Sequence, residues 1–220
     1  TRMSPTLGLL RKDRQLAWCD RTGWLSALAF ASISILVYSF AFDLAAADVR
    51  PLLPGVLWTT FLFSGIFASS QSFQRESESG TFDAMLVAPV SPSAIYVGKL
   101  LSNLISLLLV ELALLILATI LFDTPLLTGE LVLVVFVGTV GYVSPATLLS
   151  ILGSRTRARA VLFPVLVLPL LVPLLIAAVQ ATGGALGQPI GTAPWLLLLV
   201  VFALWSSIGG ALLFPVVAER

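Results

Sequence analysis

The chain has 220 residues, of which 58% are hydrophobic and only 10% are charged, and its formal net charge is +1. Soluble domains carry about 25% charged residues, so this composition excludes an ordinary soluble protein and predicts an integral membrane protein whose first partner is the lipid bilayer. A net charge this close to zero gives no indication of a nucleic-acid partner.

Six apolar stretches of 19 to 24 residues divide the chain. At about 1.5 Å per residue, each can cross a hydrocarbon core of about 30 Å as a helix, which predicts an all-α fold with six transmembrane helices. The segments between them are too short for a catalytic or nucleotide-binding domain, so we expect one transmembrane domain over residues 1–220 and no enzymatic activity. The predicted spans are Trp24–Phe42, Gly55–Phe73, Leu100–Phe122, Leu131–Leu152, Ala160–Gln180 and Pro194–Val217.

Lysine and arginine are distributed unevenly over the segments between these spans. Eleven of the 12 fall on one side of the predicted membrane, and Arg50 alone falls on the other. By the positive-inside rule, both termini and the long segment 74–99 between the second and third spans are predicted to lie in the cytoplasm.

The region before and within the first span allows two interpretations. Residues Pro5–Arg21 are predicted to form a helix on the cytoplasmic membrane surface, where their basic side chains would meet anionic headgroups. The first span is followed by Ala45-Ala46-Ala47, as the apolar core of a cleaved signal peptide can be. Its 19 apolar residues exceed the about 7–15 of such a core, so we expect the span to be retained.

Several residue types and motifs needed for chemistry are missing. The chain has no histidine and a single cysteine, Cys19, so the sequence predicts neither a histidine-based metal site nor an internal disulfide. It also contains no Walker A, G-x-S-x-G, H-E-x-x-H or C-x-x-C motif. We therefore predict no catalytic, metal-binding or cofactor-binding residue.

Small residues recur every four positions in the second span, at Ser64, Ala68 and Ser72, and beside them at Gly65 and Ser69. Such stripes let helices approach closely in lipid. We expect this stripe to pack inside the subunit, with a subunit interface or a substrate path as the alternatives.

The third span contains one ionisable residue, Glu111, near its middle. A charge at that depth costs about 2.5–3.5 kcal/mol on insertion scales, so the side chain should face protein or water. A structural role as a protonated, hydrogen-bonded carboxyl and a functional role in transport both remain open.

Glycine and proline predict irregular packing in the fourth and fifth spans. Gly138, Gly141 and Pro145 predict a kink or a close helix contact in the fourth. Three prolines each remove an amide donor from the fifth, so we expect that helix to be bent or locally unwound. These prolines are Pro164, Pro169 and Pro173. The glycine-rich stretch Ala181–Ala193 is predicted to be a loop.

The segment 74–99 is the long polar interruption of the chain. A break is predicted at Gly80, followed by a short apolar helix over Phe82–Val87 that ends at Pro89. A new helix is predicted to start with Ser91 as its N-cap and Pro92 at its first helical position.

The short helix in this segment has one apolar face, formed by Phe82, Met85 and Leu86. Charged residues edge that face: Arg75, Glu76 and Asp83. An apolar surface with a charged border suits a groove on a cytoplasmic protein, and a helix lying on the lipid headgroups is the alternative.

These residues resemble known transporter sequences. Arg75-Glu76, Gly80-Thr81, Met85-Leu86 and Pro89 resemble the loop after the second span in permeases of six-span ABC exporters. The run Leu53–Trp58 and the proline-rich run Val165–Ile176 are similar to CcmB, the family of haem exporter B subunits in cytochrome c maturation. The resemblance extends from Pro54 to Gln180.

The resemblance implies a permease of the ABC exporter type in the bacterial inner membrane, working with a separate ATPase, CcmA, and with the membrane proteins CcmC and CcmD. Such a complex supplies haem on the outer side and releases the haem-loaded chaperone CcmE. ATP would be used by the partner, and a homo-oligomer is left open. The residues that the resemblance assigns to ATPase coupling are Arg75, Glu76, Gly80, Thr81, Phe82, Asp83, Met85, Leu86 and Pro89.

Two further hypotheses remain beside this one. Axial haem ligands are scarce, since the chain offers no histidine and only Met3, Met85 and Cys19 away from the outer face. Haem would therefore be a transported or handled substrate, without direct ligation. The alternatives are a mechanical coupling scaffold that carries no haem, and an exporter of another amphiphile such as a lipid or a drug.

Overall fold

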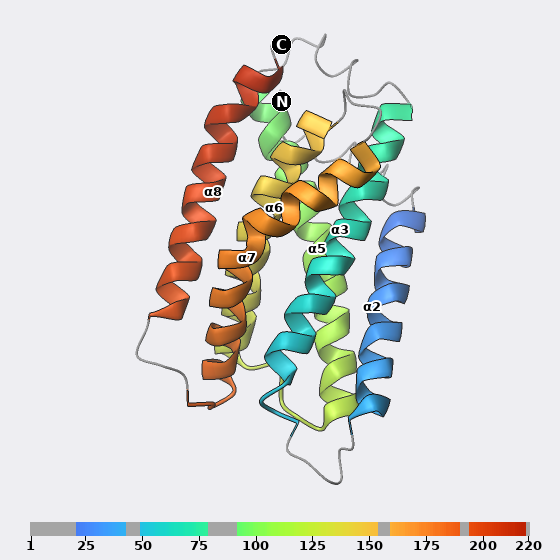
Figure 1. Ribbon diagram of the computed structural model, residues 1–220, viewed down its shortest axis with the longest axis vertical. Coiled ribbons are helices and arrows are strands. Elements are labelled where there is room, and N and C mark those ends of the chain that lie inside the picture. Colours follow the sequence, from blue (N-terminus) through green and yellow to red (C-terminus); the bar gives the residue numbers. More distant parts are fainter. Residues whose placement is uncertain (1–20, 43–48, 79–91, 154–158, 190–193, 219–220) are drawn as a thin grey trace, which may run out of the picture.

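The computed structural model describes residues 21–42, 49–78, 92–153, 159–189 and 194–218, and this part of the chain is entirely helical apart from its connections (Figure 1). The prediction of an all-α fold is confirmed for these residues, and each predicted span coincides with one helix. The predicted surface helix before residue 21 lies outside the described part. The helices are α2 (Arg21–Ala41), α3 (Leu53–Glu78), α5 (Pro92–Phe122), α6 (Gly129–Gly153), α7 (Arg159–Ala185) and α8 (Trp195–Ala218).

Five of these helices contain an apolar stretch of at least 18 residues, long enough to cross a membrane. In α3 the described apolar stretch is Leu53–Ser69, which at about 1.5 Å per residue covers about 26 Å. The side chains that face outward are largely apolar, with Phe40, Ile120 and Trp205 among the most exposed. An apolar exterior is what lipid tails require, so the chain is a multi-pass membrane protein.

Consecutive helices run in opposite directions through the bundle (Figure 1). Five helix ends therefore lie together at one end of the molecule, at the top of Figure 1: Arg21, Glu78, Pro92, Gly153 and the end of α8. The last residues of α2, α5 and α7 and the first residues of α3, α6 and α8 lie at the other end. We call the first the coupling end, after the role that the sequence resemblance implies for the segment 79–91, and the second the far end.

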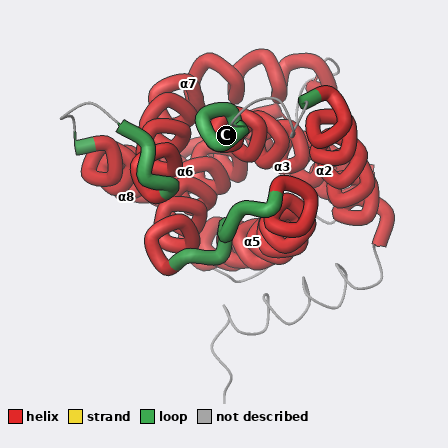
Figure 2. Tube along the Cα trace, turned by 90° about the horizontal axis from the view of Figure 1, so that it is seen from below, coloured by secondary structure: helices red, strands yellow, loops and turns green. Residues whose placement is uncertain are grey.

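Helix α6 is the centre of the bundle. It packs against α3, α5, α7 and α8, and 67% of its membrane-spanning stretch is buried, against 17% to 39% in the other four long apolar helices. In the view along the bundle, α6 lies inside while α2 and α8 lie at opposite edges (Figure 2). A change in the shape of α6 would therefore act on four neighbours.

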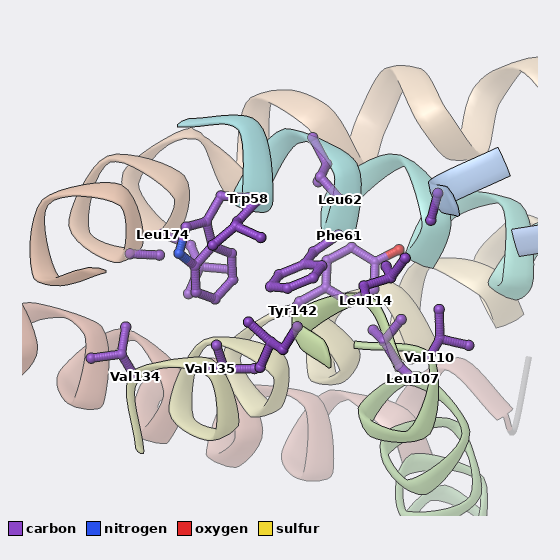
Figure 3. Packing of buried hydrophobic residues seen from close by; sticks show 14 of the residues in the cluster. Trp58, Phe61, Leu62, Leu107, Val110, Leu114, Val134, Val135, Tyr142 and Leu174 are labelled. Carbon is purple, nitrogen blue, oxygen red and sulfur yellow. The ribbon is translucent and has the colours of Figure 1, made fainter. Parts of the chain in front are cut away.

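Large side chains from α3 fill the space between α3 and α6 (Figure 3). Trp58 and Phe61 are 3% and 2% exposed, and their rings meet edge to face at 5.7 Å. Gly138 of α6 makes room for Trp58, since a Cβ at Gly138 would lie 2.1 Å from Cη2 of that indole. The close contact predicted for the fourth span is thus a Trp58–Gly138 contact.

The glycine-rich stretch after the fifth span begins as helix, so the prediction of a loop from Ala181 was wrong for its first residues. Thr182 is 1% exposed and bonded to α3, and this packing outweighs the about 1 kcal/mol that a helical glycine costs. The helix ends in a Schellman motif: Gln188 N donates to Gly183 O at 3.0 Å, and Gly187 N donates to Gly184 O at 2.9 Å. Gly187 has φ +75°, which favours glycine at this position.

Helix α5 begins at Pro92, as the sequence predicted, and α6 begins after Thr128, whose Oγ1 accepts a bond from Leu131 N at 3.4 Å. The first turns of α5 are already packed, because Ile95 and Tyr96 are 2% and 1% exposed. The helix therefore enters the bundle well before Leu100, where the apolar run of the third span starts.

Candidate functional site

The one carboxyl in the middle of the described helices is that of Glu111 in α5, and this side chain points into the bundle. It is 2% exposed, and its Oε2 lies 2.5 Å from Oγ1 of Thr139 on α6. Glu111 thus faces protein and not lipid, and its carboxyl joins α5 to the central helix.

The hydrogen bonds of Thr139 indicate where the proton of this pair lies. A threonine hydroxyl has one hydrogen to donate, and Thr139 Oγ1 also lies 2.7 Å from the carbonyl of Val135, which can only accept. Both contacts are satisfied together when Thr139 donates to Val135 and a protonated Glu111 donates to Thr139. A neutral carboxyl also avoids the large cost of burying a charge in an apolar interior. The geometry therefore favours an uncharged Glu111.

Tyr142 lies one turn beyond Thr139 on α6 and has a buried hydroxyl beside Ser69 of α3. Among the described residues that hydroxyl has no partner at ordinary hydrogen-bond distance and angle, although Ser69 is close enough to interact with it. Its ring packs on Gly65, where a Cβ would lie 2.7 Å from Tyr142 Cε1. The stripe of small residues in the second span therefore includes a contact inside this subunit.

No three His, Cys, Asp or Glu side chains come together as metal ligands in the described part of the chain. The polar groups buried in the described helices include hydroxyls, the Glu111 carboxyl, the Lys99 ammonium and the Trp58 indole N–H. The part-buried amide of Asn103 donates to Thr147 Oγ1 at 3.2 Å. These groups can hold helices together and can bind a proton at Glu111.

The three prolines of the fifth span lie within α7, which stays helical over Arg159–Ala185 and changes direction along its length (Figure 1). Pro169 and Pro173 face outward. Each proline leaves the carbonyl four residues earlier without its helical donor, so this side of α7 has fewer backbone bonds than an ordinary helix. A role in transport for Pro164, Pro169 or Pro173 stays a prediction.

The residues predicted to dock an ATPase fall at or beyond the end of α3. Arg75 and Glu76 belong to its last turns, at the coupling end. The remaining seven lie outside the described residues: Gly80, Thr81, Phe82, Asp83, Met85, Leu86 and Pro89. The structure does place the two ends of this segment, Glu78 and Pro92, at the same end of the bundle as Gly153 (Figure 1).

Comparison with known families agrees with this architecture. The family model for CcmB protein matches residues 5–215, which is nearly the whole chain. The chain belongs to the CcmB family. No curated protein matches it. CcmB proteins are membrane permease subunits, generally non-catalytic, that work in cytochrome c biogenesis and haem transport. Membership of this family supports assignment of the chain as a haem exporter subunit of an ABC transporter system that has an ATPase partner.

Sequence reasoning did not find the polar contacts that join the helices of this CcmB protein. Trp58 bonds to Thr182, and Tyr96 bonds to Ser144, over separations of 124 and 48 residues. The available signal was the presence of polar side chains within apolar spans, since each needs a partner there. This signal shows that a residue needs a hydrogen-bond partner, but it does not show which residue that partner is.

Proposed function

We propose that this chain is the membrane subunit of an ABC transporter complex that exports or delivers haem during the biogenesis of c-type cytochromes in the bacterial inner membrane. It would couple ATP hydrolysis by a CcmA-like ATPase to haem handling and to release of a haem-loaded CcmE-like chaperone, with CcmC-like and CcmD-like membrane partners. The observation that carries this proposal is the CcmB family match over residues 5–215.

The coupling end is the side on which we propose that the ATPase binds. The charge pattern supports a cytoplasmic position for this end, because Arg50 is the single basic residue assigned to the opposite side. The segment 79–91 connects α3 to α5 at this end. The spacing of Phe82, Met85 and Leu86 in the sequence predicts an apolar face that could enter a groove on the ATPase.

The first experiment replaces that apolar face and measures ATPase binding. A Phe82→Asp/Met85→Asp variant is purified with its ATPase, and the amount of copurified ATPase and the rate of ATP hydrolysis are compared with wild type. Leu127→Asp is the matched control, since Leu127 is an exposed apolar residue in the connection from α5 to α6, at the far end. We expect loss of both ATPase binding and hydrolysis only in the double variant, with an unchanged melting temperature of the membrane subunit. Wild-type binding and hydrolysis in that variant would contradict the docking site.

One observation favours a second candidate, a coupling scaffold that carries no haem. The chain has no histidine, and its other strong axial ligands, Met3, Met85 and Cys19, fall on the side that the charge pattern assigns to the cytoplasm. Strong axial ligands for haem on the outer side would then have to come from partner chains. Titration of haem into the subunit in lipid nanodiscs separates the two: a saturable absorbance change supports a haem path in this chain, and its absence supports the scaffold.

A further inference from the structure

Tyr96 ties the first turns of α5 to two other helices. It is 1% exposed, and its Oη lies 2.8 Å from Oγ of Ser144 on α6. Its ring packs against Phe214 of α8, with the ring centroids 5.3 Å apart. Tyr96 is the fifth residue of α5, directly after the segment 79–91. The end of α5 that receives this segment is therefore fixed to α6 and α8 through one side chain.

The hydrogen bonds around Ser144 have a defined direction. Ser144 Oγ lies 2.7 Å from the carbonyl of Ser206 on α8, which can only accept, so the single hydrogen of the Ser144 hydroxyl goes to Ser206. Tyr96 must then donate to Ser144. The result is a chain of donors from α5 through α6 to α8, in which each bond polarises and strengthens the next.

Gly210 of α8 provides the space that this chain of bonds needs. A Cβ at Gly210 would lie 2.0 Å from Tyr96 Oη, 2.8 Å from its Cζ and 3.1 Å from Ser144 Oγ. At the neighbouring Gly209 a Cβ would meet nothing within 4 Å. Gly209 is half-buried and Gly210 is buried, and the two adjacent glycines differ in whether a Cβ would meet the Tyr96–Ser144 contact, which makes them a useful pair for mutagenesis.

The bond from Tyr96 reaches α6 at a turn where the backbone hydrogen bonding of that helix is interrupted. Ser144 precedes Pro145, which lies inside α6 and has no amide hydrogen, so the carbonyl of Gly141 lacks its helical donor. Helices bend most easily at such positions. A force applied to α6 through Ser144 therefore acts at a turn that can change shape.

We propose that Tyr96 is the positioning residue that carries movement of the coupling end of α5 to the Ser144–Pro145 turn of α6 and to Gly210 of α8. This inference rests on the proposed function, in which the segment 79–91 contacts the ATPase. Tyr96 lies inside the bundle and acts by linking the first turns of α5 to the central helix.

The test uses the complete complex with its ATPase and haem chaperone, and it compares chaperone release with ATP hydrolysis. Tyr96→Phe keeps the ring and removes the donor. We expect ATPase binding to stay at the wild-type level, while the amount of chaperone released per ATP hydrolysed falls about fivefold, the effect of losing one neutral hydrogen bond. Ser144→Ala removes the same hydrogen bond from the α6 side and should lower the amount of chaperone released per ATP hydrolysed to a similar extent. If one of the two variants does not accumulate, the other still tests the inference.

The glycine pair supplies the control for packing. Gly210→Ala should lower the release ratio and the melting temperature, and Gly209→Ala should lower neither. Adding Tyr96→Phe to Gly210→Ala removes the atom nearest to the new Cβ, so we expect the melting temperature of the double variant to recover in part.

A wild-type release ratio in both Tyr96→Phe and Ser144→Ala would overturn the inference. So would a loss of binding, hydrolysis and release in equal proportion, because that pattern indicates a purely structural residue. Failure of the proposed function would look different: the wild-type chain itself would neither retain the ATPase nor support release.

Discussion

The indole Nε1 of Trp58 donates a hydrogen bond to Oγ1 of Thr182 at 2.8 Å and so ties α3 to α7 across 124 positions of the chain. The same indole lies on Gly138 of α6. Three helices therefore meet at one side chain near the far end of the bundle. The Tyr96 contacts join α5, α6 and α8 near the coupling end, so α6 takes part in both junctions.

Removing the indole donor should loosen the junction at the far end. Trp58→Phe leaves Thr182 without its bond and also leaves a gap, so we expect a loss of at least about 1 kcal/mol in unfolding free energy. Thr182→Ser keeps the accepting hydroxyl and should stay close to wild type. The melting temperature of the purified protein in detergent measures both, and equal values for the two variants would contradict the role given to the bond.

Filling the space beneath the indole should cost more than filling open space on the same helix. Gly138→Ala would put a Cβ 2.1 Å from Trp58 Cη2, whereas a Cβ at Gly129 would meet nothing within 4 Å. We expect Gly138→Ala to destabilise by about 1–3 kcal/mol and Gly129→Ala to have little effect. Thermal unfolding of the two variants side by side tests this, and a stable Gly138→Ala protein would show that Trp58 can move away.

An uncharged Glu111 predicts that a neutral amide can replace it. Glu111→Gln should accumulate normally and melt near wild type, since the glutamine amide can either donate to Thr139 Oγ1, as a protonated carboxyl would, or accept from it. Glu111→Leu should melt lower, because Leu provides no partner for Thr139. Infrared spectroscopy provides the direct check: the carbonyl band of a protonated carboxylic acid should be present in wild type at neutral pH and absent from Glu111→Gln. A carboxylate band in its place would refute the neutral form.

The proposed sidedness predicts where single cysteines react with a reagent that does not cross membranes. In a Cys19→Ser background, Leu127→Cys at the far end should be labelled in spheroplasts. Ala84→Cys, in the segment 79–91, should be labelled only after the membrane is opened. The reverse pattern would invert the topology and move ATPase docking to the other end.

The sequence predicted the helices well because the need to satisfy backbone hydrogen bonds in lipid leaves few alternatives for long apolar stretches. It also predicted the start of α5 at Pro92 from local proline chemistry. The end of α7 was placed too early, because the burial of Thr182 depends on Trp58, a residue far away in the chain. Predictions from neighbouring residues alone take no account of a contact between residues so far apart in the chain.

The candidate site was predictable only in part, for a related reason. Glu111 was conspicuous because a carboxyl in the middle of an apolar span needs a partner, yet Thr139, Tyr96 and Ser144 look like ordinary polar residues in sequence. Their importance comes from pairs formed across helices. The ATPase-coupling residues are a different case. The family resemblance assigned them from the sequence, and seven of the nine lie outside the described helices.

The alternating direction of the helices has a consequence for how cargo could leave the far end. The structure describes one connection at that end in full, the six residues 123–128 between α5 and α6. Under the proposed function, a turn this short offers little protein with which to enclose a flat molecule the size of haem. A receiving protein would then have to bring its own binding surface up to the membrane and take the molecule from between the helices or from a neighbouring subunit.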